Sequence, residues 1–290
     1  LFVSVNGNDA WQGNSDEPNA KGTNGPLKTI LKAQKVIHLR KMRGEFQGPV
    51  TVWIRGGEYF LDAPLRFGMD DSFVTYAAYP NEKPVISAGV RVGGFVAGTV
   101  NGRSCLIADV GDIIEKKGYF QQLFVNGQRR TRARTPKTGF YRINDILQSG
   151  NPLLKPGTFR CKPGEVKNWS RFTDIEAVTF NLWLEQRMPL ISFDEKNNIV
   201  SYGRRTRALM EGPNQYYARY YLENIKEELT EPGEWYLDKG EKKLYYITCD
   251  GENPDNLDAI VSMQLRFIEV LGMPENRHYV EALSFKGLTF

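Results

Sequence analysis

The sequence predicts an all-β (mainly β) fold: a β-solenoid that starts at an N-terminal capping helix and is interrupted by a β-sandwich-like insertion domain. Five short strand patterns lie within residues 50–87 at roughly ten-residue spacing, which is typical of stacked β architectures. A helical pattern precedes them, and a solenoid needs a cap over its first coil. The strand pattern stops near residue 92 and resumes after residue 258, and solenoids accept insertions in their surface loops.

The N-terminal segment predicts one short strand and one helix. Residues 1–5 have a strand pattern, and a loop rich in Gly, Asn and Pro follows as far as Gly25. Pro26 then stands where its missing N–H costs nothing, so the helix is expected to begin there. At about 100° per residue, one arc of the helix is apolar and is expected to cover other apolar surface. This arc contains Leu27, Ile30, Leu31, Ala33, Ile37 and Met42.

Short segments with a period of two follow the helix, and turn-forming residues separate them. An acidic pair, Asp70 and Asp71, lies in one of these turns. Adjacent residues on a strand point to opposite faces, so a turn is favoured over an acid/base couple at this pair. The predicted strands are Val50–Ile54, Glu58–Leu61, Pro64–Phe67, Phe73–Ala77 and Pro84–Ser87.

The middle of the chain contains a basic, strand-like run from Phe124 to Arg134 and several aromatic segments. Residues 234–237 and 244–247 predict a hairpin with its turn at Asp238–Gly240, as in a sandwich-like β domain. The solenoid pattern then resumes and stops on an apolar residue without a cap, so it is expected to be truncated at Phe290. We therefore divide the chain into residues 1–92 (cap and first coils), 93–258 (inserted domain) and 259–290 (return to the solenoid).

Composition excludes several classes of protein. The 38 Lys and Arg exceed the 34 Asp and Glu by only four, which gives little electrostatic attraction for nucleic acid. No window has the roughly 18 apolar residues of a membrane span. The three cysteines are far apart, so neither a disulfide framework nor a zinc site is expected. His38 and His278 are the only histidines, and neither is paired with an acid in a motif, so a serine or cysteine hydrolase is not expected. No phosphate-binding glycine loop is present, and no cofactor is expected.

Several segments, in the right order along nearly the whole chain, resemble a known family. Five of them are similar to the start of bacterial right-handed parallel β-helix proteins: Leu1–Asp9, Gly25–Ile30, Val50–Gly57, Val74–Pro80 and Lys83–Ser87. Three others are similar to the inserted domain of relatives of glycoside hydrolase family 141: Leu123–Gly127, Arg132–Arg134 and Pro232–Asp238.

This resemblance implies the N-terminal part of a secreted β-helix glycoside hydrolase that degrades a polysaccharide or oligosaccharide. Such hydrolysis needs two carboxyl groups that flank the scissile bond. The resemblance implies that these lie on later coils, so the catalytic residues are expected beyond Phe290 and none is assigned within the chain. One alternative is a polysaccharide lyase or epimerase that acts on uronic acids. Another is a non-catalytic carbohydrate-binding or surface module.

The ends of the chain add an expectation about location. The sequence begins at Leu1, without an initiator Met and without a basic and apolar leader. It is therefore interpreted as a mature or trimmed product, from which a signal peptide has been removed. A secreted, periplasmic or cell-surface location is expected.

Two sets of side chains are candidates for binding sugar hydroxyls and faces. Glu223 and Asn224 lie in an acidic cluster with Glu227, Glu228 and Glu234, while Trp183, Trp235 or Tyr236 would offer a stacking face. The competing interpretation is a solvated loop followed by core aromatics. It is favoured, because aromatic residues on strands usually pack inside.

Two further groups of polar residues are weighed in the same way. Arg129, Arg130, Arg132 and Arg134 crowd into six residues; in an alternating strand Arg129 would point away from the other three. Structural ion pairs are favoured there, with uronic-acid binding as the alternative. Asn6–Asp9, with Asp16 and Glu17, has the oxygen atoms of a calcium site but not the spacing of a known calcium loop, so a turn is favoured and no metal is expected.

Overall fold

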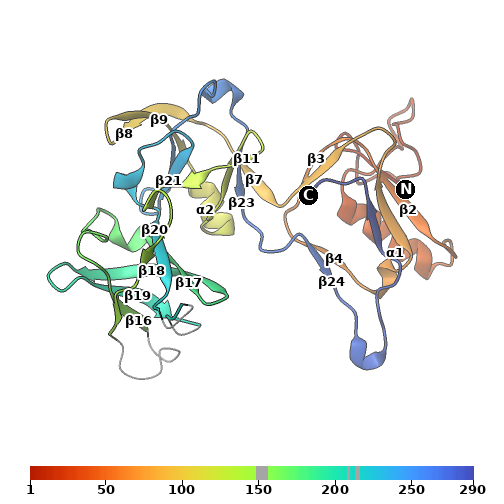
Figure 1. The fold of residues 1–290 in the computed structure, drawn as a ribbon. Coiled ribbons are helices and arrows are strands. Elements are labelled where there is room, and N and C mark those ends of the chain that lie inside the picture. The colour runs from red at the N-terminus through yellow and green to blue at the C-terminus, as the bar shows by residue number, and fades with distance from the viewer. Residues whose placement is uncertain (148–155, 208–209, 213–215) are drawn as a thin grey trace. The chain divides into compact units, whose positions relative to one another are not determined.

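A computed structural model of the protein describes residues 1–147, 156–207, 210–212 and 216–290. The chain divides into two compact units, which we call unit 1 (Leu1–Val90 with Met263–Phe290) and unit 2 (Arg91–Ser262). Both are built mainly of strands (Figure 1), which confirms the predicted mainly β class. The predicted division at residues 92 and 258 into separate domains stays a prediction. No helix among the described residues is long and apolar enough to span a membrane.

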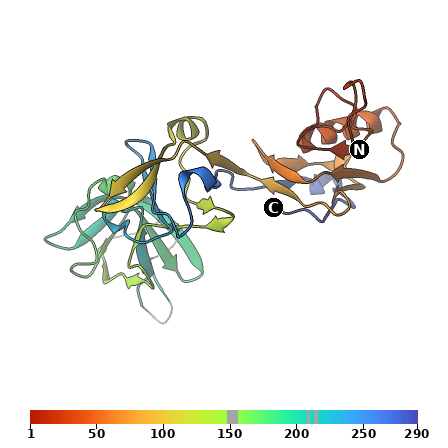
Figure 2. The same ribbon diagram turned by 90° about the horizontal axis from the view of Figure 1, so that it is seen from above.

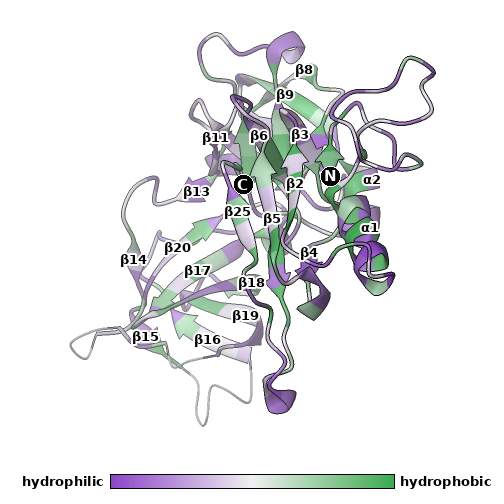
Figure 3. Cartoon of the chain, turned by 90° about the vertical axis from the view of Figure 1, so that its right-hand side faces the viewer, coloured by the Kyte–Doolittle hydropathy of each residue, from purple (hydrophilic) through white to green (hydrophobic). Residues whose placement is uncertain are grey.

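The named strands of unit 1 pair in parallel. Figure 3 shows three of them, β2, β5 and β25, side by side. Val50 is paired with Val74, and Leu65 is paired with Ile268, which lies on the other side of unit 2 in the sequence. The three sheets contain β1 (Phe2–Val3), β2 (Val50–Ile54), β5 (Val74–Ala78) and β25 (Ser284–Lys286); β3 (Gly57–Phe60) and β6 (Pro84–Ser87); and β4 (Leu65–Phe67) and β24 (Ile268–Val270). The five strands predicted within residues 50–87 are confirmed to within a residue at most ends.

The side chains of these strands alternate between the core and the surface. In β2, Val50, Val52 and Ile54 are buried while the residues between them are partly exposed. Phe67, Tyr76 and Phe285 come from three different strands and their rings lie 5.3–5.8 Å apart. The core of unit 1 is therefore an apolar column to which each sheet contributes.

The helix α1 (Ile30–Met42) begins four residues later than predicted from Pro26. Thr29 caps it, because its side-chain oxygen accepts a hydrogen bond from the Lys32 amide at 3.0 Å. The Asp9 carboxylate accepts bonds from the Lys28 and Thr29 amides at 2.8 and 2.9 Å, so these amides are satisfied outside the helix. The side chain of Asp9 therefore holds the N-terminus of the helix, and the turns over residues 4–7 and 8–11 position it.

The apolar face predicted for this helix is partly wrong. The buried residues are Ile30, Ala33, Gln34 and Ile37, whose spacing forms a single stripe, whereas Leu31 is 49% and Met42 83% exposed. Figure 2 shows α1 and the N-terminal loops on one side of the parallel strands. A stripe this narrow covers one side of unit 1. The polar Gln34 belongs to the buried stripe because its side chain has hydrogen-bond partners inside unit 1.

Those partners include Asp71, at the end of the 3-10 helix η1 (Met69–Asp71). The Asp71 side chain is fully buried and accepts bonds from Gln34 Nε2 at 3.0 Å and from the Gly68 amide at 2.7 Å. His38 Nε2 lies 2.7 Å from Asp71 Oδ1. This pair was not predicted from the sequence, because its two residues are 33 positions apart and meet only where α1 crosses η1.

We predict that Asp71→Ala destabilises the protein by about 3 kcal/mol, because Gln34, His38 and the Gly68 amide each lose a buried acceptor. Urea unfolding would measure the change. Asp70→Ala is the matched control, since Asp70 is exposed and its removal is expected to cost less than about 0.5 kcal/mol. Equal effects of the two substitutions would contradict the prediction.

Unit 2 contains two larger sheets and a smaller one. Neighbouring strands of the larger sheets run antiparallel, apart from β12 and β21, which are parallel. The five-stranded sheet has β12 (Thr131–Arg132), β21 (Glu234–Asp238), β22 (Lys243–Tyr246), β9 (Arg103–Asp109) and β8 (Val96–Val100) in this order. The eight-stranded sheet has β13 (Arg134–Thr135), β20 (Arg219–Glu223), β17 (Glu176–Asn181), β18 (Leu184–Asp194), β19 (Ile199–Arg205), β16 (Pro156–Arg160) and β15 (Asp145–Ile146), with β14 (Tyr141–Arg142) also paired to β20. The third has β11 (Gln128–Arg129), β10 (Leu123–Val125), β23 (Ala259–Ser262) and β7 (Gly89–Val92), whose first two residues belong to unit 1. The short helix α2 (Gly111–Lys117), which was not predicted, follows β9.

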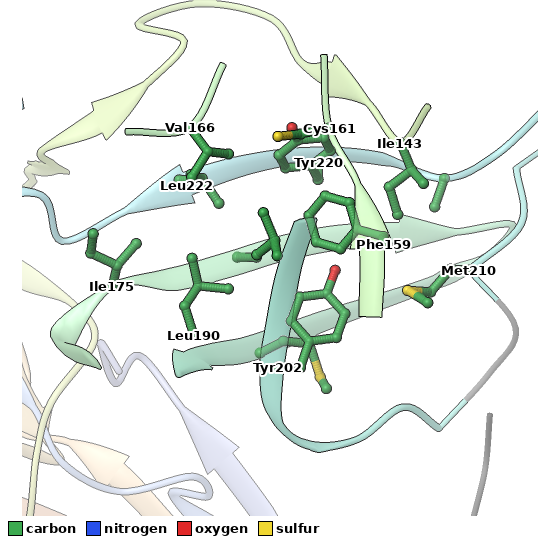
Figure 4. Close-up of a cluster of buried hydrophobic side chains, with 14 of the residues drawn as sticks. Ile143, Phe159, Cys161, Val166, Ile175, Leu190, Tyr202, Met210, Tyr220 and Leu222 are labelled. Carbon is green, nitrogen blue, oxygen red and sulfur yellow. The ribbon is translucent and has the colours of Figure 1, made fainter. Parts of the chain in front are cut away.

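The main core of unit 2 lies against the eight-stranded sheet. Figure 4 shows Phe159, Tyr202 and Tyr220 pointing into one cluster, and Phe159 lies 5.4 and 5.1 Å from the other two rings. The predicted hairpin is confirmed as β21 and β22, although its turn comprises residues 239–242 instead of Asp238–Gly240. The opposite face of β17, β18 and β20 includes Glu176, Arg187 and Tyr221, which lie at paired or neighbouring positions.

Candidate functional site

A pocket of about 210 Å³ in unit 2 is the candidate functional site, and we call it the arginine pocket. Its lining comes from β11, β12 and β13 and from the outward face of β18 and β20. Five of its nine lining residues are arginines, whereas one is acidic. The lining residues are Gln121, Arg129, Arg130, Thr131, Arg132, Arg134, Arg187, Tyr221 and Glu223.

The chain gathers these arginines because the predicted basic strand is broken into short pieces. Asn126 and Gly127 both have positive φ angles and reverse the chain, and β11, β12 and β13 then pair with β10, β21 and β20 respectively. The prediction that Arg129 points away from Arg130, Arg132 and Arg134 is therefore wrong, because it assumed one continuous alternating strand. All four line the same pocket.

Arg132 is the buried centre of the charge network. Its side chain is 3% exposed, and Nη1 donates to Glu176 at 2.8 Å and to Glu223 at 3.0 Å. Its Nε donates to Asn224 at 3.2 Å, and the guanidinium lies 5.3 Å from the Trp235 ring centroid. Glu176 and Glu223 are directly opposite each other on β17 and β20, so the arginine offsets a repulsion that the strand register creates.

The neighbouring arginines differ in how far they are neutralised. Arg187 forms ion pairs with Glu223 and Glu185, and Arg130 forms one with Glu252. The favoured interpretation of the basic run as structural ion pairs is thus confirmed for Arg130 and Arg132. Within the part of the chain that the structure describes, neither Arg129 nor Arg134 forms an ion pair.

A group of three partly exposed rings, which we call the aromatic cluster, adjoins the arginine pocket. Phe140, Phe180 and Tyr221 have ring centroids 5.1–6.2 Å apart, and Tyr221 also lines the pocket. Phe140 is 45% exposed. The Arg134 guanidinium lies 3.7 Å from the Tyr221 centroid and that of Arg219 lies 4.9 Å from the Phe140 centroid. Cationic and aromatic groups therefore form one continuous surface.

Electrostatics hold Glu176 ionised despite its burial. Burial alone would raise the pKa of this carboxyl, but the charges of Arg132 and Lys239 outweigh it and hold the pKa below its ordinary value of 4.5. Burial also raises the pKa of the Tyr221 hydroxyl and lowers that of Arg134. Both Glu176 and Glu223 share the Arg132 guanidinium, so the geometry supports a structural role for this pair.

This low pKa predicts a specific dependence of stability on pH. The unfolded state takes up a proton at Glu176 at a higher pH than the folded state, so its contribution is complete above about pH 4.5 and is lost as the pH falls through the folded pKa. Glu176→Gln is expected to flatten the fall in unfolding free energy as the pH drops below the ordinary carboxyl pKa of 4.5. Glu185→Gln, at a residue whose side chain is 48% exposed, is the control and should keep the wild-type slope.

The four sequence-predicted binding residues fall into two places. Glu223 lines the arginine pocket. Asn224 and Trp235 do not line it but contact its central residue, Arg132. Trp183 lies elsewhere, 90% exposed in the turn between β17 and β18. Trp235 is wholly buried, with its ring stacked on Phe120 at 5.8 Å, so it is a core residue and offers no face to a sugar. Tyr236 is also wholly buried and offers no face to a sugar.

Two further members of the predicted acidic cluster have structural partners. Glu234 is buried and binds Lys137, and Glu227 accepts a hydrogen bond from the Ser170 amide at 2.8 Å. Near the N-terminus, Asp16 accepts from the Tyr79 hydroxyl at 2.7 Å and Glu17 pairs with Arg55 at 2.7 Å. Glu176, Arg187 and Tyr221 were not predicted as site residues from the sequence. Their positions on the outward side of alternating strands are the signal that could have shown them.

Comparison with known proteins gives one informative structural match. A solved structure described as "Glycoside hydrolase" matches with a TM-score of 0.77 at 22% sequence identity, over 100% of this chain and 50% of that chain. The protein therefore has a glycoside hydrolase-like fold and spans half the length of that relative. A second, "The complex structure of XylC with xylose", has a TM-score of 0.42 at 14% identity, over 98% of this chain and 34% of that one, and supports no argument. No family model matches the sequence, and none of the curated proteins matches it.

Proposed function

We propose that this chain is the N-terminal part of a secreted glycoside hydrolase with a right-handed parallel β-helix fold, and that unit 2 is a carbohydrate-binding insertion in it. The observation that carries the proposal is the match over the whole chain to a glycoside hydrolase. A fold alone hosts many chemistries, so the activity needs support from sites. That support is the arginine pocket with its adjoining aromatic cluster.

The parallel pairing of unit 1 supports the β-helix part of the proposal. β2, β5 and β25 lie in one sheet, β3 and β6 in a second, and β4 and β24 in a third. Three parallel sheets formed by successive passes of one chain are the arrangement that a β-helix requires. On this proposal, unit 2 is inserted after β6 of the second sheet, and the chain then returns to β24 of the third sheet.

The catalytic carboxyl pair is proposed to lie beyond Phe290. Inverting and retaining hydrolysis both need two carboxyl groups that can reach the scissile bond, one of them protonated. Glu176 and Glu223 do not fit, because their carboxylates are shared with Arg132. The match to only half of the glycoside hydrolase is consistent with chemistry that lies on further coils.

The test is hydrolysis by a protein that extends beyond Phe290, assayed as reducing-sugar release from a panel of neutral and acidic plant and microbial polysaccharides. Release from at least one polysaccharide is expected, and a protein without aspartates or glutamates in its further coils is expected to be inert. No release from any member of the panel would reject the hydrolase.

A lyase or epimerase that acts on uronic acids is the second candidate, and the arginine pocket is the observation that favours it. Such enzymes neutralise the substrate carboxylate with cationic groups and remove the adjacent proton with a base. Unsaturated product, seen by its ultraviolet absorption, would decide for a lyase. Reducing ends without that absorption would decide for hydrolysis.

A further inference from the structure

We infer that the arginine pocket binds the carboxylate of an acidic sugar, with Arg129 and Arg134 as its ligands, while the aromatic cluster stacks against rings of the same oligosaccharide. The inference rests on the proposed carbohydrate-active function and names its substrate class. It concerns unit 2 alone and requires no residue outside the described chain.

Charge is the first argument. The pocket lining has five guanidinium groups and the single carboxylate of Glu223. Glutamates adjacent to the pocket neutralise Arg130, Arg132 and Arg187, as their ion pairs show. Arg129 and Arg134 have no ion-pair partner among the described residues, so the pocket keeps a positive excess. An anionic ligand would restore the balance.

Unused hydrogen-bond donors are the second argument. Arg134 donates through Nε to Pro136 O at 2.9 Å and through Nη2 to Gly139 O at 2.7 Å, which leaves its Nη1 group without a protein acceptor in the described structure. These bonds and the Tyr221 ring hold the guanidinium in place, so little side-chain entropy is lost when a ligand binds. Arg129 is exposed and donates no hydrogen bond to a described residue. The N–H donors that remain on these two guanidinium groups suit a carboxylate.

The volume and the polar lining of the pocket indicate that the anion is an acidic sugar. A volume of about 210 Å³ accommodates one sugar ring or a substituent and not a chain of rings. Thr131 and Gln121 add hydroxyl and amide groups that match sugar hydroxyls. The aromatic cluster begins at Tyr221, which is shared with the pocket, and continues through Phe180 and Phe140. A ring with a carboxylate in the pocket would therefore have neighbouring rings over aromatic faces.

Isothermal titration of the full 290-residue chain tests the inference. The probes are oligogalacturonate and oligoglucuronate, their methyl esters, which keep the rings and remove the charge, and a neutral cello-oligosaccharide of equal length. At least one acidic probe is expected to bind about tenfold or more tightly than its ester, with an affinity that falls as salt rises.

Three substitutions locate the site. Arg134→Gln is expected to weaken binding of the acidic probe about tenfold and to remove the preference over the ester. Arg129→Gln, which removes no hydrogen bond within the described structure, is the variant that keeps the fold if Arg134→Gln does not. Arg103→Gln makes the same charge change at an exposed arginine outside the pocket and is expected to bind like the wild type.

The outcomes separate this inference from the proposed function. Equal affinity for an acidic probe and its ester, or an equal loss in Arg103→Gln and Arg129→Gln, overturns the carboxylate site and leaves carbohydrate binding standing. No binding of any probe also overturns the inference, whereas the proposed hydrolase is judged separately by sugar release from a protein that extends beyond Phe290.

Discussion

Replacement of Arg132 by methionine is expected to destabilise unit 2 by about 3–5 kcal/mol, the usual cost of removing one partner from a buried ion pair. Methionine keeps much of the side-chain volume but leaves Glu176 and Glu223 opposite each other on paired strands, both largely buried. It also removes the donor to Asn224 Oδ1. Urea unfolding followed by fluorescence and circular dichroism would measure the loss.

Two companion variants make this prediction specific. Arg129→Met removes a charge from the same pocket at an exposed residue and is expected to cost less than about 0.5 kcal/mol. Arg132→Met combined with Glu176→Gln and Glu223→Gln is expected to recover part of the stability, because the uncompensated carboxylates are gone. A triple variant less stable than Arg132→Met alone would refute this explanation.

Asn224→Ala is expected to have the second-largest effect, about 3–4 kcal/mol. The side chain is buried and joins two sheets: Nδ2 donates to Asp174 O at 3.1 Å and to Leu237 O at 2.9 Å, and Oδ1 accepts from the Leu237 amide at 2.9 Å. Its φ angle of 65° lies in the left-handed region, which alanine adopts at a cost of roughly 1–2 kcal/mol.

A glycine variant separates the two contributions. Asn224→Gly also removes the hydrogen bonds but has no penalty at positive φ, so it is expected to be more stable than Asn224→Ala by roughly 1 kcal/mol. The same urea titration compares them. If glycine and alanine are equally destabilising, backbone strain has no part in the effect.

Short-range patterns predicted much of the fold. The alternation of apolar and polar residues was sufficient to predict β2 to β6. Aromatic residues in alternation, followed by a turn, were sufficient to predict the hairpin of β21 and β22. The start of α1 was predicted wrongly, because Pro26 is a local signal whereas the cap is Thr29, supported by Asp9 from a preceding loop. Leu31 and Met42 show the same limit: the period of a helix gives its apolar arc but not how much of that arc a neighbour covers.

The candidate site was only partly predictable. Glu223 and Asn224 were singled out, but the partners that define their roles, Glu176 and Arg187, are separated from them by more than 30 positions and meet only through strand register. Trp235 and Trp183 have identical side chains, and their opposite exposures follow from their positions, in a buried strand and at a hairpin turn. Sequence composition indicates which chemical groups are present, whereas pairing between distant strands decides which of them meet.

The pairing of β4 with β24 has a consequence for how the protein is made. Leu65 finds its partner Ile268 only after the whole of unit 2 has left the ribosome, and at a synthesis rate of about 5–20 residues per second that takes on the order of ten seconds or more. We expect unit 2 to fold first, while β4 still has no paired strand. Pulse-labelled hydrogen exchange during synthesis or refolding would show later protection at β4 than at β17 and β18, and simultaneous protection would refute this order.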